Sequence, residues 1–204
     1  DRAVILESIG SQSLRDLLLS RSSNASGRLD FSSIPMAELQ PLICSIQLGL
    51  CDALVSCGLQ PDLLIGHSLG ELTATAIAGL WTDRGAFLQL VRQRGLMMDE
   101  VCQSGASGML ATSLTNMVTL NALLQECVNT HVSNFNSPSQ VTISGPINEL
   151  ERLASQIKAN GEKATLLKVS GGFHSPLMER ASESFASHIA TSQLRSPGLK
   201  VLSL

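Results

Sequence analysis

Residues 64–71 read LIGHSLGE, an apolar run that leads into a serine held between two glycines. The run predicts a short buried strand of a parallel sheet, and the following ELTATAIAGL predicts a helix of small residues that can lie close to that sheet. A strand, a sharp turn and a helix make a nucleophile elbow, whose strained turn requires small neighbours such as Gly66 and Gly70. The stretch therefore predicts an α/β fold in which Ser68 is either a nucleophile or an ordinary turn hydroxyl.

The composition is that of a globular chain without a strongly charged face. The 204 residues are 44% hydrophobic with a formal net charge of -3, which suits one large domain or a core with a smaller insertion. Because no basic face is present, nucleic acid and anionic lipid are not expected as partners. No apolar stretch reaches about 18 residues and the N-terminus lacks a signal-peptide pattern, so we expect a cytoplasmic protein without membrane contact.

The cysteines indicate neither a metal site nor a disulfide framework. There are five of them, an odd number without CxxC or His-paired spacing. We expect free and mostly buried thiols, with Cys44 and Cys51 in buried structural roles on one helix. The other cysteines are Cys57, Cys102 and Cys127.

The first half of the chain predicts two helices separated by a polar loop. Residues 21–33, rich in Ser, Gly and Asn, predict that loop, and the second helix begins near Met36 with Pro41 in its first turns. Gly58 is expected to end this helix. Apolar residues at three- and four-residue spacing predict its core face. They are Leu39, Ile43, Ile46, Leu50 and Leu54.

The second half predicts an inserted subdomain. After an amphipathic helix over 86–101, the pattern from 105 to 168 gives strand, helix, strand, strand, helix and strand, the order of a ferredoxin-like βαββαβ unit. Leu150, Leu153 and Ile157 form one face of its second helix, which Gly161 ends. We therefore predict an α/β-hydrolase-like parallel-sheet core made of residues 1–104 and 169–204, with a ferredoxin-like subdomain at 105–168.

A serine nucleophile needs a base, and the chain offers four histidines. His67 should point away from the Ser68 hydroxyl, His188 lies on a solvated helix, and His131 lies at a strand edge of the insertion. His174 follows two glycines and Phe173 in a loop that could return to the sheet edge. We therefore predict His174 as the base.

The charged residues leave two questions open, the acid of a triad and the role of Arg94. None of the carboxylates between Ser68 and His174 follows a core strand, so no acid of a hydrolase triad is evident. Arg94 lies on an amphipathic helix just before a glycine. It is either a solvated edge residue or a bidentate anchor for a carboxylate, and the residues alone slightly favour the solvated one.

Four motifs in order, GHSLGE, the RG that follows it, FNSPSQVTISG and SGGFHSPLM, resemble the malonyl-CoA:acyl-carrier-protein transacylase family and the acyltransferase domains of polyketide and fatty-acid synthases. The resemblance covers nearly the whole chain. It implies that Ser68 is acylated, that His174 is its base and is oriented by backbone carbonyls, and that malonyl passes from CoA to the phosphopantetheine thiol of an acyl carrier protein. The implied course is ping-pong, with no bound cofactor and no metal.

The resemblance also implies roles for residues around this dyad. Arg94 would clamp the free malonyl carboxylate, which overturns the solvated interpretation, and Leu69 would supply an oxyanion N–H. Gln40 would stand at the pocket wall and Asn136 would line the cleft between subdomains. Phe173 would leave little room for an α-methyl branch and so favour malonyl, although one methyl is worth only about 1 to 3 kcal/mol in such a pocket.

The chain also departs from the family pattern. The N-terminal GQGSQ segment, which supplies the other oxyanion N–H, and the strands expected after His174 are not found, so the sequence is expected to be truncated at both ends. Two alternatives to an acyltransferase stay open: an α/β-hydrolase-type esterase or thioesterase, and an inactive remnant that docks a carrier protein. A standalone enzyme and a domain of a larger synthase also both remain open.

Overall fold

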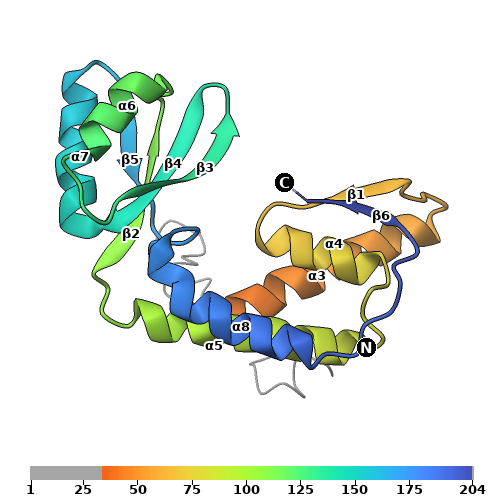
Figure 1. Cartoon of the computed structure of the whole chain (residues 1–204). Coiled ribbons are helices and arrows are strands. Elements are labelled where there is room, and N and C mark those ends of the chain that lie inside the picture. Colours follow the sequence, from red (N-terminus) through yellow and green to blue (C-terminus); the bar gives the residue numbers. More distant parts are fainter. Residues whose placement is uncertain (1–33, 204) are drawn as a thin grey trace, which may run out of the picture. The chain divides into compact units, whose positions relative to one another are not determined.

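The computed structural model describes residues 34–203 (Figure 1). The chain divides into two compact units, unit 1 with residues up to Leu96 and from Phe185 onward, and unit 2 with Met97–Ser184. Each unit is described by itself. The loop predicted at 21–33 and the helix predicted before it lie outside the described residues.

Unit 1 holds the predicted strand, turn and helix. Strand β1 (Leu63–Ile65) leads into helix α4 (Leu69–Ile77) and pairs in parallel with β6 (Lys200–Leu202). The parallel pairing confirms the sequence prediction, but the predicted burial of the strand is wrong, because Leu63 and Ile65 are 47% and 59% exposed. Leu63 and Ile65 lie on the same face of this strand, and the described residues leave that face largely uncovered.

Helix α3 (Met36–Ser56) has the bounds that the sequence predicts but buries another face. The predicted core residues Ile46, Leu50 and Leu54 are 42%, 61% and 54% exposed. The helix is apolar around most of its circumference, so the spacing of apolar residues did not distinguish the inner face from the outer one. The buried residues are Ala37, Gln40, Pro41, Leu42, Cys44, Ser45 and Leu48. Gly58 ends the helix as predicted, with φ +89°.

Helix α3 also corrects the expectation that the chain has no apolar stretch of about 18 residues. Among the described residues it is the helix that is long and apolar enough, by length and composition, to cross a membrane. The sequence argument missed it because Glu38 and Asp52 interrupt the apolar run. A core helix passes the same test, and Cys44 and Leu48 of α3 belong to the buried cluster of unit 1.

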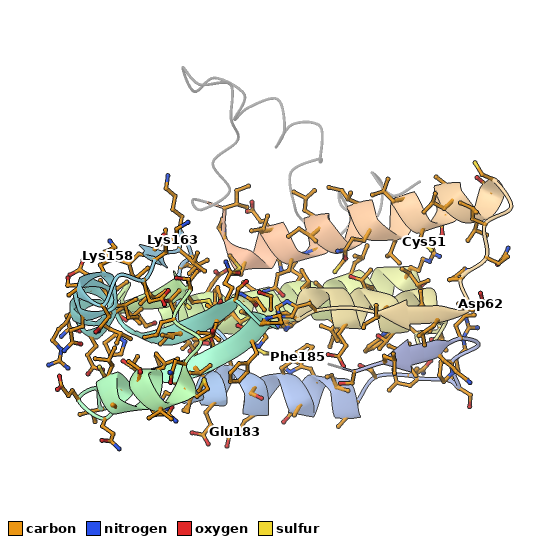
Figure 2. The ribbon with its side chains drawn as sticks, turned by 90° about the horizontal axis from the view of Figure 1, so that it is seen from above. Cys51, Asp62, Lys158, Lys163, Glu183 and Phe185 are labelled. Atoms are coloured by element: carbon orange, nitrogen blue, oxygen red, sulfur yellow. The ribbon has the colours of Figure 1, made fainter. Side chains whose placement is uncertain are left out.

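That cluster packs α3, α4, α5 (Arg84–Cys102) and α8 (Glu179–Ala190) together. Phe185 of α8 packs against it, whereas Cys51 of α3 is only partly buried (Figure 2). The Thr73 hydroxyl of α4 donates to Gln47 Oε1 of α3 at 2.6 Å and lies 3.3 Å from Cys44 Sγ. These bonds attach the short helix α4 to the long helix α3.

Burial raises the pKa of the Cys44 thiol from 9.0 to about 11, against smaller opposing effects of the Thr73 hydrogen bond and the Arg94 charge. The thiol therefore stays protonated in the folded chain where the unfolded chain already ionises. We expect the free energy of unfolding to fall between pH 9 and 11 by about 2 kcal/mol from this group. Urea unfolding across this range measures it, and an equal fall in Cys44→Ala would contradict the assignment.

All five cysteines are free. Cys44, Cys102 and Cys127 are buried, as the sequence predicts for most of them, while Cys57 is exposed. The prediction of a buried Cys51 is wrong: it lies on the same face of α3 as Cys44, but in the last turns of the helix, where no residue after Leu48 is buried.

Unit 2 contains a four-stranded antiparallel sheet with two helices. In chain order the elements are β2 (Ser107–Thr112), α6 (Met117–Leu124), β3 (His131–Ser137), β4 (Gln140–Pro146), α7 (Ile147–Ala159) and β5 (Ala164–Leu166). The strands lie in the order β3-β4-β2-β5. The sequence predicted this order of elements, although α6 and β5 end earlier than expected.

The core of unit 2 lies between its sheet and its helices. Leu150, Leu153 and Ile157 of α7 are each 0% exposed, which confirms the predicted face. They pack with Leu110 of β2 and Ile143 of β4. Gly161 ends α7 with φ +82°, while Lys158 near the helix end and Lys163 after it lie at the surface (Figure 2).

Candidate functional site

Ser68 has a strained backbone. It lies between β1 and α4 with φ 52° and ψ -116°, a combination that costs about 1 to 3 kcal/mol in a residue other than glycine. Although Ser68 occupies the N-cap position of α4, its side chain makes no capping hydrogen bond to that helix. The strand, the strained turn and the helix have the arrangement that a nucleophile elbow requires.

The two glycines that flank Ser68 differ in how much space they have. A Cβ at Gly66 would overlap the backbone of Gly70 and Glu71, so the turn requires glycine there. Apart from its chain neighbours and the backbone of its own helix, a Cβ at Gly70 would have no heavy atom of the described chain within 4 Å. The requirement for small residues is confirmed at Gly66 and is wrong at Gly70, because the close approach is made by the backbone of Gly70 and not by its side-chain position.

Leu69 is the first residue of α4. The first N–H groups of a helix have no intrahelical acceptor, and the helix dipole adds partial positive charge at this end. The N–H of Leu69, the residue directly after Ser68, therefore lies at the helix end that favours an anion.

Arg94 and Gln40 are brought together by α5 and α3. Arg94 Nη1 donates to Gln40 Oε1 at 2.7 Å, and Gln40 is only 4% exposed. The adjacent Gly95 makes this possible, because a Cβ there would overlap the backbone of Met36 and Ala37 at the start of α3. The glycine of the RG pair therefore lets the two helices approach closely enough for the guanidinium to reach the amide.

The charge of Arg94 is partly desolvated and not neutralised within the described chain. Burial lowers the pKa of its guanidinium, with a smaller opposing effect of Cys44. In the described residues the arginines that pair with carboxylates are Arg84, with Asp52 at 2.8 Å, and Arg180, with Glu100 at 2.8 Å. Arg94 instead forms its hydrogen bond with the neutral side-chain amide of Gln40. A partly buried guanidinium in this state can still take a carboxylate ligand.

His174 belongs to unit 2 and has the second strained backbone. Its φ is 56°, and in the described chain Ser68 and His174 are the non-glycine residues with positive φ. The histidine is exposed, while the glycines two and three positions before it are buried. Phe173 is partly buried, and its carbonyl accepts a hydrogen bond from the Ser144 hydroxyl at 2.6 Å.

Asn136 lies on β3 of unit 2 and is exposed. Its side-chain amide donates to Thr142 Oγ1 at 2.8 Å and to Gln140 Oε1 at 3.1 Å, both on β4. These bonds brace the hairpin of β3 and β4. The cleft role expected of Asn136 stays a prediction.

The predicted site residues are therefore divided between the units. Unit 1 holds Ser68, Leu69, Arg94 and Gln40, and unit 2 holds Phe173, His174 and Asn136. The other histidines are an exposed His188 on α8, as predicted, an exposed His67 and a partly buried His131. In the part of the chain that the structure describes, no group of three or more His, Cys, Asp or Glu side chains could hold a metal ion.

Sequence reasoning missed the residues that support the His174 loop. Ser107 of β2 accepts a hydrogen bond from Gly172 N at 3.1 Å, and Ser144 of β4 donates to the Phe173 carbonyl. Ser144 is 0% exposed, in a strand that also buries Thr142. A hydroxyl at such a position needs a partner, and that was the signal available in the sequence.

Comparison with known proteins gives consistent matches. The acyl transferase domain family matches residues 9–203. The malonyl CoA-acyl carrier protein transacylase of Synechocystis is 38% identical over 176 residues, which are 85% of this chain and 58% of the relative. Norsolorinic acid synthase of Emericella nidulans is 36% identical over 82% of this chain and 8% of the synthase.

A solved structure agrees with these relatives. It is a malonyl-transacylase in complex with a type II polyketide synthase acyl-carrier protein, and it matches with a TM-score of 0.83 at 25% identity, covering 98% of this chain and 64% of that one. The mixed α/β fold is thus shared with transacylases and acyltransferase domains. The chain spans less than two thirds of the length of these relatives.

Proposed function

Because the chain belongs to the acyl transferase domain family, we propose that it moves a malonyl group from CoA to the phosphopantetheine thiol of an acyl carrier protein through an acyl-enzyme on Ser68. One observation carries this proposal. The two residues that the motifs assign as nucleophile and base, Ser68 and His174, are the non-glycine residues held at positive φ in the described chain. Such strain persists where the surrounding structure fixes a functional residue.

The reaction needs two acyl transfers with one proton carrier. His174 accepts the Ser68 proton as the hydroxyl oxygen attacks the thioester carbonyl, and the C–S bond breaks as CoA takes that proton and leaves as the thiol. The carrier-protein thiol then gives its proton to His174 and attacks the ester carbonyl. The bond from this carbon to the Ser68 oxygen breaks, and His174 returns the proton to that oxygen, which restores the Ser68 hydroxyl. The Leu69 N–H stabilises the oxyanion of each tetrahedral intermediate.

The test is the intact mass of the chain after brief incubation with malonyl-CoA. The proposal predicts a covalent malonyl adduct that disappears when holo carrier protein is added. An adduct that is lost to water equally fast without carrier protein would favour an esterase or thioesterase, and no adduct would favour the inactive docking remnant. The relatives support neither alternative.

Residues around the dyad would select the acyl group. We assign the malonyl carboxylate to Arg94, which Gln40 holds by its side-chain amide in the pocket wall. Phe173 would disfavour an α-methyl branch, and Asn136 would line the acyl cleft. No metal or bound cofactor takes part in this scheme, in which malonyl-CoA is the donor and phosphopantetheine arrives on the carrier protein.

Arg94→Ala should lower kcat/KM for malonyl-CoA by about 10- to 100-fold, since a hydrogen bond to a charged group contributes about 1.5 to 3 kcal/mol. The use of acetyl-CoA, which has no free carboxylate, should fall much less. Acylation rates with both donors measure the difference. Arg84→Ala on the same helix removes only an exposed ion pair with Asp52 and should change neither rate. Equal losses on the two donors in Arg94→Ala would argue against the clamp.

We also propose the finer architecture and setting that follow from the family. Residues 1–104 and 169–204 would form an α/β-hydrolase-like core, which the parallel pair of β1 and β6 supports, and residues 105–168 a ferredoxin-like subdomain, which the strand order β3-β4-β2-β5 supports. The place of action would be cytoplasmic. The carrier protein would be separate or part of the same synthase, since relatives of both kinds match.

A further inference from the structure

We propose that Ser144 is a positioning residue for His174, and that it acts by fixing the loop of residues 171–175 to the sheet of unit 2. The inference rests on the proposed function, because it takes His174 as the base. All of the residues involved belong to unit 2.

The loop is attached to two neighbouring strands by hydroxyl groups. Ser144 of β4 donates to the Phe173 carbonyl at 2.6 Å, and Ser107 of β2 accepts from Gly172 N at 3.1 Å. Within the loop, the Ser175 hydroxyl donates to the Gly172 carbonyl at 2.6 Å. Hydrogen bonds on both sides of Phe173 thus restrict the peptide unit that carries His174.

Close packing restricts the same loop. A Cβ at Gly171 would overlap Cys102 Sγ, and a Cβ at Gly172 would lie 2.9 Å from Leu177 Cδ1 and 3.4 Å from the Gly108 carbonyl oxygen of β2. Both glycines are buried, while His174 is exposed. The start of the loop, at the two glycines, is therefore buried and closely packed, while the part that carries His174 is exposed.

The strained backbone of His174 explains why this residue has to be held in place by its neighbours. A residue at φ 56° relaxes to a more common conformation unless its neighbours prevent it. The Phe173 carbonyl is the last backbone group before His174 that a side chain of the sheet holds, and Ser144 is 0% exposed. Without the Ser144 hydroxyl, this carbonyl loses that hydrogen bond, and the backbone that carries the imidazole is held less firmly.

Ser144→Ala should lower the rate of Ser68 acylation by about tenfold, the effect of one lost buried hydrogen bond. Both malonyl-CoA and acetyl-CoA should be affected equally, because His174 serves both, and KM for either should stay nearly unchanged. Ser144→Thr keeps the hydroxyl and should recover most of the rate. The matched control is Ser133→Ala, which removes a hydroxyl bond to the Thr142 carbonyl in the same sheet but does not contact the loop.

A double-mutant cycle separates positioning from general loss of structure. In a His174→Ala background, Ser144→Ala should cause no further loss, because the group it positions is gone. A second tenfold loss in that background would overturn the proposal. Full activity of His174→Ala by itself would instead contradict the proposed function.

Amide hydrogen exchange gives a readout that does not need activity. Ser144→Ala should speed exchange in a peptide covering residues 171–178 and leave a peptide covering β2 unchanged. Unchanged exchange in the loop would overturn the proposal even if the acylation rate falls. If the parent chain forms no adduct at all, the proposed function fails, and hydrogen exchange still decides whether Ser144 holds the loop.

Discussion

Ser68→Ala should abolish the malonyl adduct that intact-mass measurement detects after incubation with malonyl-CoA. The effect is expected to be the largest of any single substitution, at least about a thousandfold in transfer rate, because no other group can form the acyl ester in that position. The folded state should be kept. Ser68 is held at φ 52° and its side chain does not cap α4, so replacing it removes no stabilising cap.

Two comparisons make the experiment decisive. Ser56→Ala removes another hydroxyl of unit 1, which bonds only to the Ala53 carbonyl at the exposed end of α3, and should leave the adduct intact. Methylmalonyl-CoA and acetyl-CoA, offered in parallel, report the acyl class through the adduct mass. An adduct that persists in Ser68→Ala would place the acyl group on another residue and reject the elbow serine as nucleophile.

The elbow could be predicted from sequence because its requirements are local. The strand, the turn and the helix follow one another within residues 63–77, and the glycine at Gly66 is required by backbone contacts only a few residues away. The inward face of α7 was equally predictable, because its polar and apolar residues are clearly segregated. In both cases, one short segment carries all the information.

The remaining features depend on contacts between distant segments. Helix α3 is apolar on several sides, so its inner face is decided by α4 and α5, and the predicted stripe through Leu50 proved to be exposed. The Arg94–Gln40 bond requires the close helix approach at Gly95, which no spacing reveals. Ser144 lies far from Phe173 in the chain, and only the fold brings its hydroxyl to that carbonyl.

Gly66→Ala should lower the free energy of unfolding by about 3 kcal/mol and should prevent acylation of Ser68. The added Cβ would overlap the backbone of Gly70 and Glu71, which cannot move away as a flexible side chain could. The turn would have to open, and the Ser68 hydroxyl and the Leu69 N–H would then no longer have the relative positions that an oxyanion site requires. Urea unfolding and adduct formation measure the two effects.

Gly70→Ala is the matched control, since it adds the same methyl group to the other glycine of the motif. Gly70 lies in helix α4, and outside its chain neighbours and the backbone of this helix its Cβ would meet no heavy atom of the described chain within 4 Å. Alanine is the better helix former by about 1 kcal/mol, so this variant should be as stable as the parent or more so. If both substitutions destabilise the chain equally, glycine is required throughout the turn; if neither does, the close approach at Gly66 is not a constraint on the elbow.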